Sequence, residues 1–270
     1  MHMLHEYATP PLVVKYGGNA MPRDGLDPLL SEAAERHAAG QPIVIVHGGG
    51  PEIDRALAER GVAPRRVDGL RVTDAQTLAV TEAVLCATLN KRLVRTCRAL
   101  GATAVGISGQ DGGLLVARRM RTEAGADLGY VGEIVRTDPH LLRALLSAGF
   151  LPIVSPLAIA HGGEHAYNVN ADSAAGAIAA ALRARALIVV TNVARVLRDP
   201  DDPASGVDAF SAVEAERFAR SDACRDSMKP KVRAAVAAVA GGAEAAYLCA
   251  AGPNAIAGAL RGDATIVRAR

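Results

Sequence analysis

The sequence predicts a three-layer α/β/α sandwich with a mainly parallel central sheet and two lobes. Short apolar runs alternate with segments of helical periodicity along the 270 residues, which is the pattern of an α/β fold. The runs at 12–16 and 42–46 are almost entirely apolar, as expected of strands that helices cover on both faces. Each run leads into glycines, at 17–18 and 48–50. In a parallel sheet both turns lie at the carboxyl edge, where such sheets bind ligands.

The other elements follow the same alternation. A helix over 73–100 is the longest, and Thr73 with Gln76 matches a capping box at its start. One face of this helix could serve a subunit contact, although an entirely internal role explains its pattern equally well. A boundary near 183–185 separates a larger N-terminal lobe from a smaller C-terminal lobe. The expected strands are 12–16, 42–46, 102–107, 151–155, 186–190, 245–249 and 264–268, with hairpins over 114–136 and around 161–170. The other expected helices are 27–39, 51–60, 138–148, 173–182, 211–220, 230–240 and 253–260.

The composition excludes several classes of protein. Hydrophobic residues make up 50% of the chain, so a substantial core is expected rather than disorder. Aromatic residues are only 3% and the formal net charge is +2, so we expect no nucleic-acid partner. No apolar run is long enough for a membrane span. Four cysteines without a Cys-x-x-Cys pair and a start without signal-peptide features indicate a cytoplasmic protein.

The two glycine turns are the strongest local signal for a site. Free backbone N–H groups at a helix start, together with the helix dipole, bind anions. Lys15 stands beside the first turn, and Pro51 after the second suits the first turn of a helix. The pattern favours a phosphorylated or carboxylate ligand, although the glycines could serve tight turns alone. The motifs of P-loop enzymes and of dinucleotide-binding folds are absent from the sequence.

Two further segments carry polar groups that fit a ligand. Asn168, Asn170 and Asp172 would share one face of an extended segment, although Asp172 could simply cap the following helix. Lys229 and Lys231 lie where a helix begins. Lysines there oppose the helix dipole, which suggests that they serve an anion, although a solvated basic turn is the alternative.

Five motifs in order resemble those of the amino acid kinase family. They are 15–21 (KYGGNAM), 47–53 (HGGGPEI), 69–74 (GLRVTD), 127–133 (DLGYVGE) and 168–172 (NVNAD). The resemblance extends from about 12 to 267. It is strongest to members that transfer the γ-phosphoryl group of ATP to the side-chain carboxylate of N-acetyl-L-glutamate, the second step of arginine biosynthesis. It implies that residues 1–184 bind the acyl substrate and form a homodimer, and that residues 185–270 bind ATP.

The resemblance also implies roles for individual residues. Lys15 and Lys231 would be catalytic and flank the transferring phosphoryl group, with Asp172 between them to orient both ammoniums. The residues expected to bind phosphate are Gly17 and Gly18, and those expected to bind the acyl substrate are Gly49, Gly50, Arg71 and Asn168. The residues expected to bind the nucleotide are Thr191, Asn192, Val193 and Leu197. Mg²⁺ would arrive with ATP, and no protein site for a metal is expected.

The sequence departs from the family pattern at three places. Asn192 replaces an aspartate and Arg195 replaces a glycine in the nucleotide loop. Ser227 replaces a glycine in the loop before Lys231. Only 11 residues precede the first expected strand, and the family's C-terminal Gly-x-Gly-Thr pattern is missing near Gly262. From this last departure we expect a homodimer that arginine does not inhibit.

Two other functions stay open at this point. One is a sister kinase that acts on aminoadipate or glutamate linked to a carrier protein. A small acidic carrier would fit a basic rim, and Arg118, Arg119 and Arg121 form a basic cluster. The other is a non-catalytic amino-acid sensor on the same fold, for which Asn192 and Arg195 would be the reason.

Overall fold

A long, mainly parallel sheet forms the centre of the protein. The computed structural model describes residues 9–22, 27–67, 69–122, 125–163, 165–225 and 227–270. Over these ranges the sheet has eight strands in the order β12-β14-β13-β11-β1-β2-β8-β5. Only β14 runs antiparallel to a neighbour, β13, and β12 pairs in parallel with β14. The strands are β1 (Leu12–Tyr16), β2 (Ile43–His47), β5 (Ala104–Ser108), β8 (Leu151–Ser155), β11 (Ala186–Thr191), β12 (Ala209–Ser211), β13 (Ala246–Ala250) and β14 (Thr265–Arg268).

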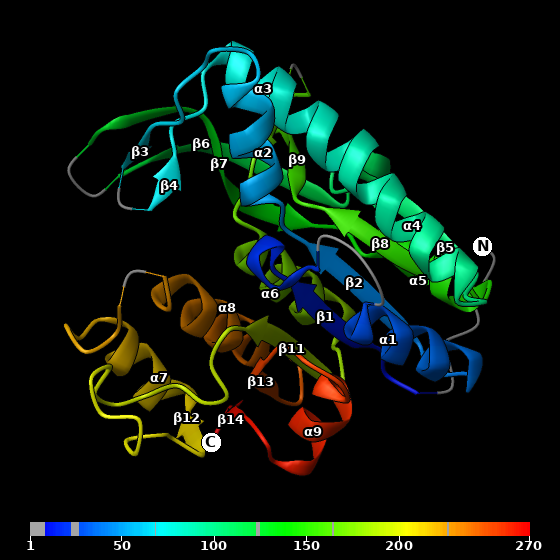
Figure 1. Ribbon diagram of the computed structural model, residues 1–270, viewed down its shortest axis with the longest axis vertical. Coiled ribbons are helices and arrows are strands. Elements are labelled where there is room, and N and C mark those ends of the chain that lie inside the picture. Colours follow the sequence, from blue (N-terminus) through cyan, green and yellow to red (C-terminus); the bar gives the residue numbers. More distant parts are fainter. Residues whose placement is uncertain (1–8, 23–26, 68, 123–124, 164, 226) are drawn as a thin grey trace.

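Helices cover both faces of this sheet, so the expected three-layer fold is confirmed (Figure 1). Successive residues of β1 belong to opposite cores, Val13 to one and Leu12 and Val14 to the other, because side chains alternate along a strand. One face carries α1 (Pro28–Ala38), α2 (Gly50–Ala58), α3 (Ala75–Glu82), the π-helical segment η2 (Ala83–Leu89), α4 (Asn90–Ala99) and α9 (Ala255–Arg261). The other carries α5 (His140–Ser147), α6 (Ala171–Leu182), α7 (Ala212–Ala219) and α8 (Lys229–Ala240).

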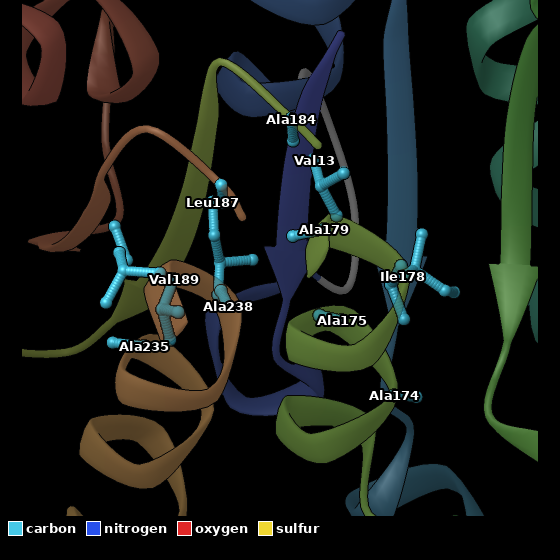
Figure 2. Packing of buried hydrophobic residues seen from close by; sticks show 14 of the residues in the cluster. Val13, Ala174, Ala175, Ile178, Ala179, Ala184, Leu187, Val189, Ala235 and Ala238 are labelled. Carbon is cyan, nitrogen blue, oxygen red and sulfur yellow. The ribbon is translucent and has the colours of Figure 1, made fainter. Parts of the chain in front are cut away.

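Small residues allow α6 and α8 to lie close together over the sheet. Figure 2 shows Ala175 and Ala179 of α6 and Ala235 and Ala238 of α8 over the strands that carry Val13, Leu187 and Val189. A Cβ atom on Gly176 would lie 2.7 Å from the carbonyl oxygen of Ala234. The two backbones are therefore nearly in contact, which holds the start of each helix in a defined place.

A smaller sheet and a short hairpin complete the larger part of the fold. Strands β6 (Leu115–Arg121), β7 (Asp127–Thr137), β9 (Leu157–Ala160) and β10 (Ala166–Asn168) close into a small ring. The hairpin consists of β3 (Arg66–Val67) and β4 (Leu70–Arg71). Thr73, just after it, accepts from Tyr130 N and donates its own N–H to Leu128 O, so the hairpin is tied to β7. Figure 1 shows β3 and β4 beside β6 and β7.

The long helix differs from its prediction at both its start and its middle. Its cap is Asp74, whose side chain accepts from Thr77 N at 2.7 Å. Thr73 cannot cap because its backbone pairs with β7, and its hydroxyl donates to Arg71 O. The predicted capping box was therefore wrong. Between α3 and α4 the helix widens into η2, which no periodicity in the sequence indicated.

Two other predictions concern the boundary between the lobes and the N-terminal segment. Strand β1 pairs with both β2 and β11, so one sheet runs through both predicted lobes, and the division at 184 stays a prediction. The first eight residues, on which the expectation about the N-terminal segment partly rests, lie outside the described residues. No helix in the described part of the chain combines the length and hydropathy that a membrane span requires.

Candidate active site

Two glycine turns meet at the carboxyl ends of β1 and β2. Gly48 N donates to Tyr16 O at 2.9 Å, which joins the end of one strand to the turn of the next. A Cβ atom on Gly18 would lie 2.9 Å from Pro51 Cδ and 3.2 Å from Gly49 Cα. Only glycine at position 18 allows the turns to approach this closely. The sequence prediction that both turns share one edge of the sheet is confirmed.

The second turn leads directly into α2 and leaves donors available. Gly49 is the N-cap of α2 and Gly50 its first residue, and Gly49 provides no side-chain cap. Among the residues that the structure describes, the backbone N–H groups of Gly49 and Gly50 have no hydrogen-bond acceptor. Free N–H groups at the positive end of a helix dipole form an anion site. Oxygens of a phosphoryl group or carboxylate fit these donors.

A cluster of three charged side chains, two of them buried, lies beside the first turn. Lys15 Nζ is 2.8 Å from Asp172 Oδ1, and Lys231 Nζ is 3.8 Å from Asp172 Oδ2. Lys15 and Asp172 are only 6% and 5% exposed. A Cβ atom on Gly17 would lie 3.2 Å from Lys15 Nζ, so this ammonium adjoins the first glycine turn. The carboxylate thus lies between two ammoniums, as the family resemblance implied.

With two lysines and one aspartate, the cluster carries a net positive charge. Burial lowers the pKa of Lys231, the charge of Asp172 raises it, and Lys15 lowers it. Lys231 also donates to Ser227 O at 2.7 Å, which directs its ammonium toward the cluster. Two ammoniums facing one carboxylate can receive an additional anion, because a negative group offsets their mutual repulsion.

Asp172 reaches the cluster from the first turn of a helix rather than from a strand. Asn170 is the N-cap of α6, and its Oδ1 accepts from Asp172 N and Ser173 N. The expectation that Asn168, Asn170 and Asp172 share one extended face was therefore wrong. The chain turns into the helix at 171, so only Asn168 remains on a strand. The positive end of α6 favours the carboxylate of Asp172 there.

A cavity of about 180 Å³ opens beside the second glycine turn. Arg71 and Asn168 both line it, together with the three glycines at 48–50. The guanidinium of Arg71 donates to Asp54 and, through Nη2, to Gly50 O at 3.2 Å. Asn168 Nδ2 donates to Thr73 Oγ1 at 3.2 Å. The structure thus brings together all four residues expected to bind the acyl substrate.

Sequence reasoning missed two charged residues at this cavity, Arg66 in its wall and Asp54 behind the arginines that line it. Asp54 of α2 pairs with Arg71 and also with Arg66 Nη2 at 2.9 Å, and Arg66 lines the cavity. Asp54 follows the HGGG segment on the first turns of α2, and a helical projection from Gly50 could have placed it near the turn. Nothing in the sequence indicated that Asp54 contacts Arg66 and Arg71, which lie 12 and 17 positions later.

The residues expected to bind the nucleotide end a strand next to β1. Thr191 is the last residue of β11, which pairs with β1, and its Oγ1 accepts from Val193 N at 3.0 Å. Asn192 follows directly, and Leu197 forms a bridge with Gly206. Arg195 pairs with Asp208 at 2.8 Å and donates to Gly262 O. Arg195 therefore ties this loop to the C-terminal part of the chain.

Comparison with known proteins places this geometry in a family. The model of the amino acid kinase family matches residues 10–249. This chain belongs to the amino acid kinase family. It is 45% identical over 240 residues to the acetylglutamate kinase of Brevibacillus brevis, with 88% of each chain covered. It is 41% identical over 261 residues to that of Methanopyrus kandleri, covering 95% of this chain and 99% of the relative.

A solved structure extends the likeness to three dimensions. The protein smu.665 from Streptococcus mutans matches with a TM-score of 0.79 at 25% identity, over 96% of this chain and 98% of that one. The family resemblance read from five motifs is thus confirmed. The individual roles of the site residues in this amino acid kinase stay predictions that the geometry motivates.

The basic cluster of this amino acid kinase is largely neutralised. Arg118 pairs with Glu133 at 2.9 Å, and Arg119 makes two hydrogen bonds to Asp127. These two arginines therefore do not form a rim of unpaired basic charge that would suit an acidic carrier. Over the described ranges, no group of three or more His, Cys, Asp or Glu side chains could hold a metal ion.

Proposed function

We propose that this amino acid kinase is an acetylglutamate kinase. It would transfer the γ-phosphoryl group of ATP to the side-chain carboxylate of N-acetyl-L-glutamate, the second step of arginine biosynthesis. The observation that carries the proposal is the pair of lysines around Asp172 beside the first glycine turn, at the same edge of the sheet as a cavity lined by an arginine. The acetylglutamate kinases to which the chain is 41–45% identical support the choice of substrate.

The reaction joins two anions, so the site must hold them in line and offset their charge. A carboxylate oxygen of the substrate attacks the γ-phosphorus while the bond from that phosphorus to the β–γ bridging oxygen breaks. The products are the acyl phosphate and ADP. Lys15, beside Gly17, would contact the γ-phosphoryl oxygens, and Lys231 would offset the charge that develops on the leaving β-phosphate. Asp172 contacts both ammoniums and would keep them in register.

The cavity would hold the acyl substrate. The planar fork of Arg71 suits the α-carboxylate, and Asp54 together with Gly50 O keeps the guanidinium in place. Asn168 would bind the same end of the substrate. The side-chain carboxylate would then lie at Gly49 and Gly50, whose N–H groups donate to oxygens of the substrate and of the transferring group.

ATP would bind where β11 ends, at Thr191, Asn192, Val193 and Leu197. Its phosphates would extend to Gly17 and Gly18. The protein offers no cluster for a metal among its described residues, and Asp172 already faces two lysines. The phosphates of ATP would therefore be the principal ligands of Mg²⁺, which would offset part of their charge.

The deciding experiment is ATP-dependent formation of an acyl phosphate, trapped as the hydroxamate. N-acetylglutamate is tested beside glutamate, aspartate and free aminoadipate. We expect turnover on N-acetylglutamate alone, and its collapse in Lys15→Ala with the circular dichroism spectrum unchanged. Silence on all four compounds, with ATP still bound, would favour a carrier-linked substrate, and silence without ATP binding would favour a sensor. Full turnover by Lys15→Ala would overturn the mechanism.

We further propose a cytoplasmic homodimer that arginine does not inhibit. None of the four cysteines, all of which are described, forms a disulfide, which suits a reducing compartment. Along the long helix Ala75, Ala79, Ala83 and Ala87 are exposed at intervals of four, a stripe that permits close approach of a second copy. Light scattering should give twice the chain mass. A hexamer, or inhibition by millimolar arginine, would contradict this proposal.

A further inference from the structure

A buried histidine ends the strand that leads into the second glycine turn. His47 is the last residue of β2 and is 0% exposed. Its Nδ1 lies 2.8 Å from Gly48 O, and its Nε2 lies 3.2 Å from Asn90 Nδ2. None of the roles derived above uses His47 or Asn90. A fully buried polar pair at the edge of the site therefore calls for its own explanation.

The partners of the ring determine which nitrogen carries the proton. A carbonyl oxygen can only accept, so Nδ1 must be the N–H that donates to Gly48 O. Asn90 Nδ2 also donates to Ile153 O at 2.9 Å, which identifies that atom as the amide nitrogen. Nε2 must then accept from Asn90. Burial lowers the pKa of His47 to about 4, so the ring stays neutral in this tautomer at neutral pH.

The hydrogen bond from His47 controls the orientation of one peptide group. In a planar trans peptide, the carbonyl of Gly48 and the N–H of Gly49 point in opposite directions. When His47 draws the carbonyl oxygen toward the buried ring, the Gly49 N–H is turned the other way. Gly49 lines the cavity that holds Arg71 and Asn168. Its N–H has no acceptor among the residues placed in the structure, as expected of a donor reserved for a ligand.

The π-helical segment η2 positions Asn90, the residue that holds His47. Asn90 directly follows η2 and is also 0% exposed. A Cβ atom on Gly49 would lie 2.7 Å from Leu85 Cδ2 and 2.7 Å from Leu89 Cδ2. Leucines of η2 therefore press on Gly49 while Asn90 holds the histidine next to it. Figure 1 shows α4, which Asn90 begins, lying along β8 and β5. Interruptions of this kind in α-helices occur frequently at functional sites.

We propose that His47 and Asn90 are positioning residues for phosphoryl transfer, which hold the Gly48–Gly49 peptide so that the Gly49 N–H faces the reacting oxygens. The inference rests on the proposed function for the identity of those oxygens. Neither side chain touches the cavity itself. Their effect is to fix the direction of a donor before the substrate binds, which reduces the reorganisation needed in the transition state.

The test compares variants that keep or lose the Nδ1–H donor. His47→Leu and Asn90→Leu remove one link each, whereas His47→Asn keeps an N–H near the position of Nδ1. We expect kcat to fall about 10²-fold in the two leucine variants, as for other misaligned catalytic groups. The Kd of ATP should stay within about twofold, and His47→Asn should recover most of the lost kcat. His37→Leu is the control, because His37 bonds Thr103 on another part of the surface.

Two measurements separate a positioning role from a merely structural one and do not need turnover. The ring ¹⁵N shifts of His47 should show the neutral Nδ1–H tautomer in the wild type, and the Nε2 shift should change in Asn90→Leu, which removes the donor to that nitrogen. Hydrogen exchange of the Gly49 amide should change in both leucine variants but not in His37→Leu. If wild type does not phosphorylate N-acetylglutamate, the proposed function fails while these two readouts stand. An unchanged kcat in His47→Leu, an equal loss of kcat in His37→Leu, or the Nε2–H tautomer would overturn the inference.

Discussion

Asp172 lies beside two ammoniums, that of the buried Lys15 and that of the partly buried Lys231. Its oxygens lie 2.8 Å from Lys15 Nζ and 3.8 Å from Lys231 Nζ. Without this carboxylate the two positive charges would face one another in a poorly solvated place. The lysines would then separate or lose a proton, and either change weakens their hold on a phosphoryl group.

Asp172→Asn should lower kcat about 10²-fold, the usual cost of removing one preorganised electrostatic contact. It should also shift the pH profile. Burial and Lys15 lower the pKa of Lys231, whereas Asp172 raises it, so removal of the carboxylate lowers that pKa further. Activity that needs charged Lys231 is lost as the pH rises through its pKa. The alkaline limb of the kcat profile should therefore move to lower pH, and a limb that stays in place would argue against Lys231 as the titrating group.

We expect Asp54 to influence substrate affinity through the arginines that it holds. It pairs with Arg71 and Arg66, which both line the cavity. In Asp54→Asn we expect the KM for N-acetylglutamate to rise about tenfold, the value of one hydrogen bond to a charged group. The value of kcat should change less than about twofold, because the geometry of the transferring group is intact. Asp127→Asn is the matched control, since it removes the exposed pair with Arg119. Equal changes in KM in both variants would count against a specific role of Asp54.

Helices α6 and α8 must pack closely, because the site depends on both. The two helices carry Asp172 and Lys231, so their separation sets the distance between these side chains. Gly176 lies against the backbone of α8, where a Cβ atom would be 2.7 Å from Ala234 O. Because the contact is with backbone rather than with a movable side chain, the helices must shift to admit even a methyl group.

Gly176→Ala should therefore destabilise the protein by about 2 kcal/mol through overpacking, even though alanine favours helix. Urea unfolding measures this change, and turnover should fall as Lys231 moves from Asp172. Ser173→Ala, an exposed position on the same helix, is the control and should change stability by less than about 0.5 kcal/mol. A Gly176→Ala variant as stable as wild type would show that α6 and α8 can separate freely.

Over the whole molecule, a buried carboxylate joins the beginning of the described chain to its end. Glu32 of α1 accepts from Ile256 N at 2.9 Å and from Ala257 N at 2.7 Å. These N–H groups belong to the first turn of α9, whose N-cap Asn254 provides no side-chain cap. Glu32 therefore acts as the cap of a helix more than two hundred residues away.

Glu32→Gln should remove the charge of this cap and leave one donor poorly matched. We expect a loss of about 2 kcal/mol, which for a chain of this size lowers the melting temperature by about 4–8 °C. Differential scanning calorimetry provides the measurement. Glu35→Gln, on the same helix but exposed, should leave the melting temperature unchanged. The same melting temperature for Glu32→Gln would mean that water or another group replaces the cap.

Much of this architecture could be predicted, because the patterns behind it are local. The strands with continuous apolar side chains and the helix that starts at the second glycine turn follow from periodicity and turn residues. The two-residue strands β3 and β4 could not be predicted this way, since a strand so short has no period. The same holds for Thr73, whose pairing with β7 overrides its local preference for a helix cap.

By itself, the sequence determined the layered α/β class, the shared edge of the two glycine turns and the family of the protein. These features depend on residue types at short spacing, which a single chain displays directly. Only the tertiary structure decided that Asp54 holds Arg71, that Asn90 holds His47, and that Asp172 reaches two lysines from inside a helix. Each of these contacts joins residues from different elements. Their approach depends on how the helices pack and where η2 widens the long helix, and no local pattern in the sequence records that geometry.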